Sequence, residues 1–359
     1  MVKMEANTGK RNLLDMSPPE IMDFCLSLDE KKYRGRQVAS WIFRRGVESL
    51  EQMTDIAKAT RAKMAEHVYL KHLNCLELQE DDEAKKILWE LEDGQTVESV
   101  LIRERDHMTL CISSQVGCAL GCRFCRTGTM GFIRNLSQGE IIGQVIGAQK
   151  LLRGNEQLTN IVFMGMGEPL LNRENVTKAI GIICDSDYLA FAKKHVSLST
   201  VGIVPELPRL AEGPEIGLTV SLSAPTDELR DKLMPINRKY PLKQLKEALA
   251  AWPLAHARRI TVAYVLLKGV NDSPETASKL SRFLAGLKVK INLIPFNPWP
   301  GAPFEAPSFS AVNRFKEILT DKNHTVMVRW SKGGKVSAAC GQLAGERKNT
   351  ICSGEKESS

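Results

Sequence analysis

Short apolar runs alternate with helical stretches along most of this chain, from about residue 108 onward. The apolar runs cover 109–113, 160–166, 195–200, 217–223, 259–267, 290–296 and 325–330, and helical stretches at 137–152, 173–184, 242–252, 274–287 and 309–319 separate most of them. This alternation is typical of parallel strands joined by helical crossovers. The sequence therefore predicts an α/β fold in which residues 108–345 form a partial (β/α)6-type TIM barrel, with its chemistry at the carboxyl ends of the strands. A doubly wound open sheet is the alternative.

Smaller elements are expected before the barrel. Residues 33–47 and 55–70 carry apolar side chains at helical spacing, so residues 1–83 are predicted to form a small helical domain. Asp93-Gly94 lies between two alternating runs, which predicts a β-hairpin that links the two parts at 84–107. The polar tail at 346–359 is expected to be mobile.

The composition is that of an ordinary folded chain, with 43% hydrophobic and 25% charged residues among 359. This length allows one large domain and a smaller one, and the composition excludes collagen-like, coiled-coil and wholly disordered chains. No apolar run approaches the roughly 18 residues of a membrane span, and residues 1–10 lack the apolar core of a signal peptide. We therefore expect a soluble, cytoplasmic protein with no membrane partner.

A basic segment at Lys31–Arg45 stands out against the modest net charge of +7. It contains no acidic residue, and Tyr33, Trp41 and Phe43 are interleaved with its cations, which are Lys31, Lys32, Arg34, Arg36, Arg44 and Arg45. Basic and aromatic side chains together favour contact with nucleic acid over contact with a membrane. A solvated helix face is the simpler interpretation.

Nine cysteines occur in the chain, and four of them fall between Cys111 and Cys125. An odd number without a secretion signal argues against a disulfide framework, and the clustering indicates a metal. Cys118, Cys122 and Cys125 follow the first predicted barrel strand. Thiolates are preferred ligands of iron–sulfur clusters, and three of them would leave one iron of a four-iron cluster free to hold a substrate. A structural zinc site takes four ligands and a redox dithiol takes two, so both fit the triplet less well.

The triplet Cys-x3-Cys-x-Phe-Cys resembles the signature of the radical S-adenosylmethionine (SAM) superfamily. Further motifs at 113–118, 130–136, 164–169, 291–298 and 338–345 resemble those of the RlmN/Cfr family of RNA adenine methyltransferases, and the resemblance runs from about residue 12 to residue 345. It implies a [4Fe–4S] cluster whose unique iron binds SAM and cleaves it to a radical. Radical chemistry suits the electron-poor C2 and C8 carbons of adenine, to which polar methyl transfer is unfavourable.

The resemblance also implies roles for two further cysteines and one carboxylate. One SAM methylates Cys340, a radical from a second SAM activates that methyl group, and addition to adenine gives a covalent protein–RNA adduct. Cys111 helps to resolve the adduct, which ends in a transient Cys111–Cys340 disulfide that a reductant must reopen. Glu98 handles protons near the reacting base. Apart from the resemblance, both cysteines would be interpreted as buried structural thiols and Glu98 as a solvated strand residue.

Candidate SAM-binding residues follow from the same resemblance. Gly167 and Glu168 would receive the SAM ammonium group, and Ser199 and Asn297 would contact its ribose and adenine. Ser221, Leu222 and Ser223 form a further SAM-binding stretch. Family members commonly have Ser-Leu-His-Ala where this chain has Ser221-Leu222-Ser223-Ala224, so a serine hydroxyl stands in place of an imidazole.

Taken together, the resemblance implies methylation of adenine C2 in 23S rRNA and in a tRNA, supported by a cellular electron donor, and we expect a monomer. RNA is expected to contact the basic segment and the N-terminal helices, with Arg258, Arg259, Lys332 and Lys335 extending the positive surface. Two alternatives stay open. One is methylation at adenine C8, and the other is a non-catalytic RNA-binding protein stabilised by an iron–sulfur or zinc site, in which Cys111 and Cys340 are idle.

Overall fold

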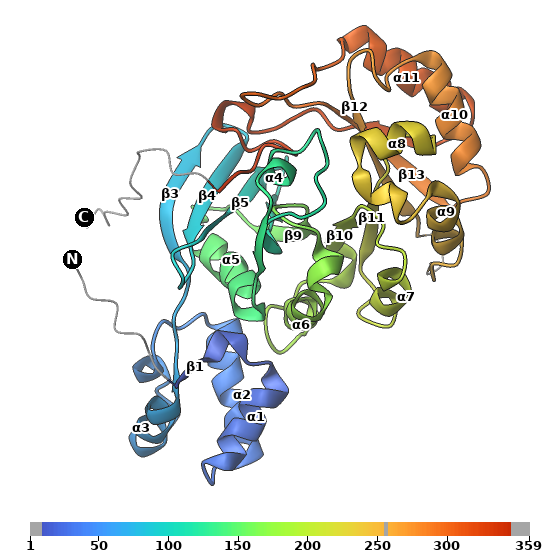
Figure 1. Cartoon of the computed structure of the whole chain (residues 1–359). Helices are drawn as coiled ribbons and strands as arrows, with labels where there is room; N and C mark the ends of the chain where they lie inside the picture. Colours follow the sequence, from blue (N-terminus) through green and yellow to red (C-terminus); the bar gives the residue numbers. More distant parts are fainter. Residues whose placement is uncertain (1–8, 255–257, 346–359) are drawn as a thin grey trace.

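One curved sheet dominates the computed structural model, which describes residues 9–254 and 258–345 (Figure 1). Its ten strands run in the order β14-β13-β12-β11-β10-β9-β6-β5-β4-β3. Their bounds are β3 Asn74–Glu80, β4 Ala84–Glu90, β5 Thr96–Arg103, β6 Met108–Cys111, β9 Leu158–Phe163, β10 Val196–Thr200, β11 Gly217–Ser221, β12 Ile260–Leu266, β13 Val289–Pro295 and β14 Val326–Val328. From β6 to β14 all neighbours are parallel and the order does not reverse. This confirms the partial barrel, because a doubly wound sheet would need a reversal of strand order.

Helices follow most of the parallel strands, as the sequence predicts. The barrel helices are α4 Arg126–Thr129, α5 Gln138–Lys150, α6 Arg173–Cys184, α7 Glu206–Ala211, α8 Asp227–Leu233, α9 Leu242–Ala250, α10 Pro274–Leu284 and α11 Phe309–Asp321, with short helical turns η4 Pro169–Asn172, η5 Lys193–His195, η6 Pro235–Arg238 and η7 Gly334–Val336. The expected helices are present with bounds shifted by a few residues. Helices α7 and α8 were not predicted, because elements of six and seven residues are too short to display a helical period.

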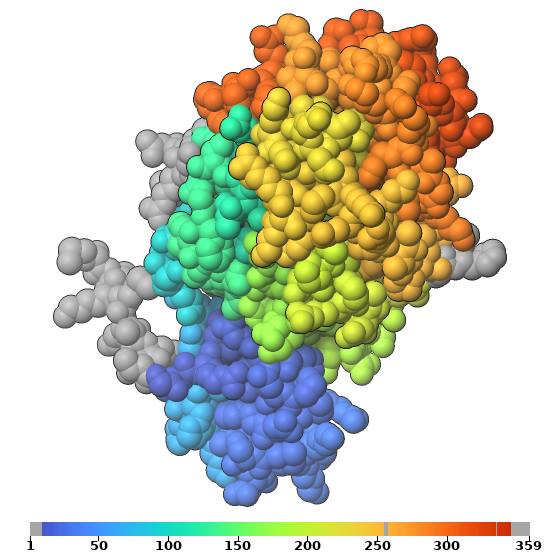
Figure 2. Space-filling view, turned by 45° about the vertical axis from the view of Figure 1, so that its right-hand side comes forward, coloured from blue at the N-terminus to red at the C-terminus, as the bar shows by residue number. Residues whose placement is uncertain are grey.

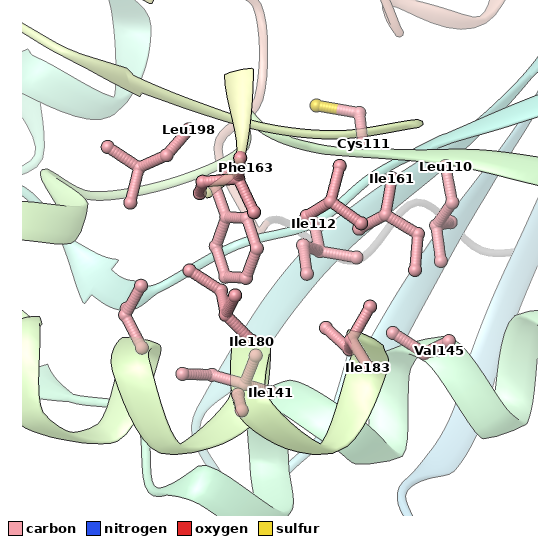
Figure 3. Packing of buried hydrophobic residues seen from close by; sticks show 14 of the residues in the cluster. Leu110, Cys111, Ile112, Ile141, Val145, Ile161, Phe163, Ile180, Ile183 and Leu198 are labelled. Atoms are coloured by element: carbon pink, nitrogen blue, oxygen red, sulfur yellow. The ribbon is translucent and has the colours of Figure 1, made fainter. Parts of the chain in front are cut away.

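Alternating side chains on the strands separate the hydrophobic core from the inner face of the barrel. Leu110 and Ile112 point toward the side chains of α5 and α6, while the sulfur of Cys111 between them points the opposite way (Figure 3). Ile161 and Phe163 of β9 are buried on the same side as Leu110. The period of two along a strand therefore places Cys111 on the inner face of the barrel.

The predicted hairpin is formed by β4 and β5, with the left-handed Gly94 (φ +80°) in its turn. Because β5 pairs with β6, the hairpin continues the main sheet and does not stand apart as a linker. Strand β3 precedes it and pairs with β4, although residues up to 83 were expected to be helical. Apolar and polar residues alternate only weakly along β3, so the strand is recognised from its pairing with β4 and not from its sequence.

A small helical lobe precedes the sheet and lies at one end of the molecule, in blue in Figure 2. Its η1 turn (Leu13–Asp15) packs against the start of α5. Its elements are β1 Arg11–Asn12, η1 Leu13–Asp15, α1 Pro18–Ser27, α2 Lys32–Ala39, η2 Ser40–Arg44, η3 Leu50–Gln52, α3 Lys58–His67 and β2 Val68–Tyr69. The side-chain amide of Gln138 donates to the carbonyls of Leu14 (3.1 Å) and Met16 (3.2 Å), and the N–H of Gly139 donates to Asp15 (3.1 Å). These bonds join the lobe to the barrel. The tail at 346–359 lies outside the described residues.

Candidate active site

A cavity of about 950 Å³ occupies the inner side of the curved sheet. Four of the candidate residues line it: Cys111, Cys125, Asn297 and Cys340. Its size lies at the upper end of the range for ligand sites, which is roughly 300–1,000 Å³. The barrel therefore offers room for more than one small molecule beside these cysteines.

A tight loop carries the cysteine triplet. It leaves β7 (Gln115–Gly117), which pairs with β8 (Phe132–Asn135), and turns at Gly117 with φ +73°. A Cβ atom at Gly117 would collide with the carbonyl of Gly131, and one at Gly128 would lie 2.9 Å from the carbonyl oxygen of Cys122. The chain therefore folds back closely on itself here, and the glycines are what allow it.

The three thiols of the triplet lie within electrostatic reach of one another. Burial raises the pKa of Cys118 to about 11, and it raises the pKa of Cys122 and of Cys125 as well; the neighbouring Cys125 raises the first two further. An apolar cluster surrounds the loop, made by Cys122, Ala224, Leu233, Met234, Leu267 and Phe296. Three soft ligands in an apolar shell fit an iron–sulfur cluster, whose properties depend on such exclusion of solvent. No group of three His, Cys, Asp or Glu side chains in the described ranges could hold a single metal ion. A four-iron cluster does not need such a group, because each thiolate binds a different iron at its own corner of the cluster.

Glu168 lies buried between the ends of β9 and β10. Its carboxylate accepts hydrogen bonds from the N–H groups of Leu170 (3.1 Å) and Val201 (2.9 Å), which fix its orientation. Burial raises the pKa of Glu168 to about 7 despite these donors, and its charge also acts on Cys118. Gly167 turns with φ +98°, and a Cβ atom there would press against the side chain of Gln115 at 2.5 Å. A buried carboxylate beside the thiol loop is a suitable acceptor for a cationic group.

The stretch Ser221–Ser223 ends β11 and is held by other parts of the barrel. Leu222 is buried in the core and its N–H donates to the carbonyl of Ala263 (2.9 Å). Ser223 adopts φ +53°, and its hydroxyl accepts a hydrogen bond from the N–H of Val265 (3.3 Å). The hydroxyl therefore supports the backbone of the neighbouring strand, in a position where the family commonly has an imidazole.

Arg230 is a candidate residue that the sequence analysis missed. It is fully buried, and its guanidinium donates to the carbonyls of Val201 (2.6 Å), Ser221 (3.3 Å) and Leu222 (3.3 Å) and to the side chain of Asn237 (3.0 Å). Burial lowers the pKa of Arg230 to about 10. This side chain ties the ends of β10 and β11 together near Cys122. Its place in a short charged helix is typical of a solvated residue, so only contacts distant in the sequence identify it.

Ser199 and Asn297 occupy the strand ends that the sequence analysis expects. Ser199 pairs with Thr219 across β10 and β11, and it shares a strand face with Ser197, which lines the cavity. The side-chain amide of Asn297 donates to the carbonyl of Cys340 (3.1 Å), and its oxygen accepts a hydrogen bond from the hydroxyl of Ser331. Asn297 is thus a direct support for the loop of Cys340, a role the sequence analysis did not anticipate.

Hydrogen bonds hold the C-terminal loop that carries Cys340 against the thiol triplet. The N–H of Arg126 donates to the carbonyl of Gly341 (2.8 Å), and the hydroxyl of Thr127 donates to that of Leu343 (2.7 Å). Cys340 interacts electrostatically with both Cys111 and Cys125. Cys111 is buried, which raises the pKa of its thiol, whereas Cys340 is exposed at the surface, although the protein around its sulfur still raises its pKa. All eight described cysteines are free thiols, so the structure does not support the Cys111–Cys340 disulfide.

Glu98 on β5 is buried and supports the same loop. One carboxylate oxygen accepts the N–H of Ala344 (2.8 Å), and the other faces the ammonium group of Lys86 at 3.2 Å. Glu98 is only 3% exposed, so it is not a solvated strand residue. The hairpin therefore delivers a paired carboxylate to the loop of Cys340.

The cations expected to bind RNA fall into two groups. The first group lies on the N-terminal lobe, where Arg34 is half-buried and the exposed cations are Lys31, Lys32, Arg36, Arg44 and Arg45. The guanidinium of Arg45 lies 3.9 Å from the ring centre of Trp41. Arg258, Arg259 and Lys332 line the cavity, and Lys332 pairs with Glu104 (2.9 Å). The side chain of Lys335 lies outside the described part of the structure. In that part, no helix is long and apolar enough to cross a membrane.

Comparisons with known proteins agree with this arrangement. Residues 11–70 match the model of the ribosomal RNA large subunit methyltransferase N-terminal domain, and residues 112–280 match that of the radical SAM superfamily. The dual-specificity RNA methyltransferase RlmN of Desulfosudis oleivorans is 50% identical over 88% of this chain and 86% of its own length, and that of Geobacter sulfurreducens is 47% identical over 92% and 91%.

A solved structure matches nearly the whole fold. The radical SAM methyltransferase from Sphaerobacter thermophilus superimposes with a TM-score of 0.88 at 41% identity, covering 94% of this chain and 100% of that one. The match includes the N-terminal lobe as well as the barrel, since so large a share of both chains is covered. This chain belongs to the RlmN family of radical SAM methyltransferases.

Proposed function

We propose that this chain methylates C2 of an adenosine in 23S rRNA and in tRNA, with Cys340 as the methyl-carrying residue. The placement of Cys340 carries the proposal: bonds from Arg126, Asn297 and Glu98 hold its loop among the thiol triplet, the candidate SAM-binding residues and the hairpin. The relatives are named as dual-specificity RNA methyltransferases, which supports two classes of RNA substrate. Methylation at C2 rather than C8 is what the resemblance of the sequence motifs implies.

The enzyme uses a [4Fe–4S] cluster and SAM, as its family does. Cys118, Cys122 and Cys125 would each bind one iron as a thiolate, so cluster binding must displace their protons. When bound, the cluster and SAM supply homolytic chemistry that removes hydrogen from carbon, which no side chain can supply. Glu168 would hold the SAM ammonium group, and Ser199, Asn297 and the stretch Ser221–Ser223 would contact the rest of SAM.

The remaining chemistry falls to side chains around Cys340. The Cys340 thiolate would attack the methyl carbon of SAM and accept the methyl group, with S-adenosylhomocysteine as the leaving group. The Cys340 thiol must therefore lose its proton first, and the nearby charge of Arg329 favours the thiolate. Cys111 reaches the same space from β6, where it can assist release of the methylated base. Glu98 would move a proton at the adenine carbon through the oxygen that now faces Lys86.

RNA binding extends beyond the cavity in this proposal. Exposed cations of the basic segment would bind phosphates, and the target adenosine must leave its stack to reach the cavity. A low-potential electron donor is required to reduce the cluster. We place the reaction in the cytoplasm and propose that the enzyme acts as a monomer.

The decisive experiment is anaerobic reconstitution with iron and sulfide, followed by SAM and an rRNA fragment. Mass spectrometry of the nucleosides separates 2-methyladenosine from 8-methyladenosine. We expect the 2-methyl product from the wild type and from Cys184→Ala, a cysteine outside the site, and none from Cys340→Ala. An 8-methyl product would overturn the regiochemistry, and wild-type protein that forms no 5′-deoxyadenosine from SAM would overturn the enzyme assignment.

Removal of two cations tests the RNA surface of the N-terminal lobe. Arg44→Ala together with Arg45→Ala should weaken RNA binding and lower the slope of log affinity against log salt by about two, because each contact with phosphate contributes about one. Lys243→Ala with Arg314→Ala, two exposed cations of α9 and α11, is the matched control. Equal affinities and slopes for both double variants would mean that this face is not the RNA site.

A further inference from the structure

Two large aromatic side chains lie exposed at the free edge of the sheet. Phe309 begins α11 and Trp330 follows β14, and their rings stack with centroids 5.3 Å apart and an interplanar angle of 19°. Phe309 is 67% exposed and Trp330 is 48% exposed. The stacked rings restrict each other's orientation, but they bury little apolar surface. Stabilisation of the fold therefore does not explain why they are placed here.

Trp330 lies between two residues that reach the active site. The side chain of its neighbour Arg329 interacts electrostatically with Cys340. On the other side, the hydroxyl of Ser331 donates to the side chain of Asn297. Trp330 itself lines the cavity and is half-exposed. The aromatic pair is therefore next to the chemistry, one residue removed from both the methyl-carrying cysteine and a candidate SAM contact.

Most charged side chains that line the cavity are positive. The described residues that line the cavity include the cations Lys194, Arg258, Arg259, Lys290, Arg329 and Lys332. Glu104 is the acidic member of that lining, and Lys332 neutralises it at 2.9 Å. A polyanion is therefore attracted to this cavity. Lys194, Arg258, Arg259 and Lys290 stand at the amino ends of β10, β12 and β13, whereas Arg329 follows the carboxyl end of β14 and is the direct neighbour of Trp330.

We propose that Phe309 and Trp330 form a stacking platform for an unpaired RNA base next to the target adenosine. Single-stranded RNA is recognised by aromatic faces that stack on splayed bases and by cations that bind the backbone, and both are present at this rim. The platform would hold the neighbouring nucleotide outside while the adenosine enters the cavity. The inference rests on the proposed function, because it takes the RNA substrate from there.

Tryptophan fluorescence provides a direct test. A short single-stranded RNA with one central adenosine is titrated into the full chain, alongside the same strand with abasic positions flanking that adenosine. The signal of Trp330 is the difference between the wild type and Trp330→Phe. Affinity is measured for Trp330→Ala, Phe309→Ala and the control Met327→Ala, which removes an exposed apolar side chain from β14. Circular dichroism checks that each variant is folded.

We expect RNA to quench Trp330 and the abasic strand to leave it unchanged. Trp330→Ala should bind the intact strand about tenfold more weakly, because loss of one stacked base costs about that much, while Trp330→Phe and Met327→Ala keep their affinity. Equal affinity of Trp330→Ala and the wild type, or equal quenching by both strands, would overturn the platform. A change in oligomeric state of Trp330→Ala would overturn it too, because the pair would then belong to a contact between copies. If these binding tests fail but the enzyme still methylates RNA, the stacking platform is refuted and the proposed function stands. If RNA quenches Trp330 but no methylated nucleoside forms, the proposed function is refuted and the platform stands.

Discussion

Replacement of Glu168 by glutamine tests the electrostatics at the carboxyl ends of β9 and β10. Burial raises the pKa of Glu168 from 4.5 to about 7 in the folded protein. Between these values the folded state holds a proton that the unfolded chain has released, so stability falls as the pH rises. This difference between the two pKa values corresponds to about 3 kcal/mol of unfolding free energy. The protein has this stabilisation at low pH and has lost it above about pH 7. The Glu168→Gln variant stays neutral and is spared this loss.

The assay is urea denaturation of cluster-free protein between pH 4 and 8, followed by circular dichroism. The free energy of Glu168→Gln relative to the wild type should rise by about 3 kcal/mol across that range. Taking the difference cancels the other titrating groups, which are shared by both proteins. Glu174→Gln, at an exposed site on α6, is the control and should follow the wild type. Parallel pH profiles for Glu168→Gln and the wild type would show that this carboxyl group titrates normally.

Three further perturbations address the thiol loop and its support. Cys118→Ala should lose the iron and the visible absorbance of the reconstituted protein, whereas Cys184→Ala keeps both. Arg230→Met removes the buried guanidinium that donates to three carbonyls at the ends of β10 and β11, and it should destabilise the fold by about 3 kcal/mol or more in urea denaturation; an unchanged midpoint would refute that role. Gly117→Ala should prevent cluster assembly because its Cβ collides with Gly131, whereas Gly121→Ala meets open space and costs only about 1 kcal/mol of backbone strain; equal iron content in the two would contradict this.

Local patterns were sufficient to predict the barrel and the cysteine loop. Each parallel strand is a short apolar run bounded by turns, so its position is set by neighbours in the sequence. The spacing of Cys118, Cys122 and Cys125 likewise needs no distant contact, because all three lie on one loop. Strand β3 was missed because its weakly alternating residues become a strand only by pairing with β4.

The roles of some residues could not be predicted from local sequence, because their contacts are made by residues distant in the sequence. Glu98 looks like a solvated strand residue until the hairpin meets Ala344, which lies 246 positions away. Arg230 looks like part of an exposed charged helix until the ends of β10 and β11 converge on it. In both cases the buried polar group is identified by its hydrogen-bond partners, and those partners exist only in the folded state.

The same distant contacts explain how an incomplete barrel can enclose a site. Strands β14 and β6 are the two ends of the parallel part of the sheet and do not pair with each other, since β6 pairs with β5 instead. The C-terminal loop runs from β14 back toward β5 (Figure 1). The ammonium group of Lys332 donates to the carbonyl of Arg103 (2.6 Å) at one end of this loop, and the N–H of Ala344 donates to Glu98 at the other. Cys340 lies between these two attachments. The segment that closes the open side of the barrel is therefore the one that carries Cys340, so closure of the site and placement of Cys340 depend on the same few hydrogen bonds.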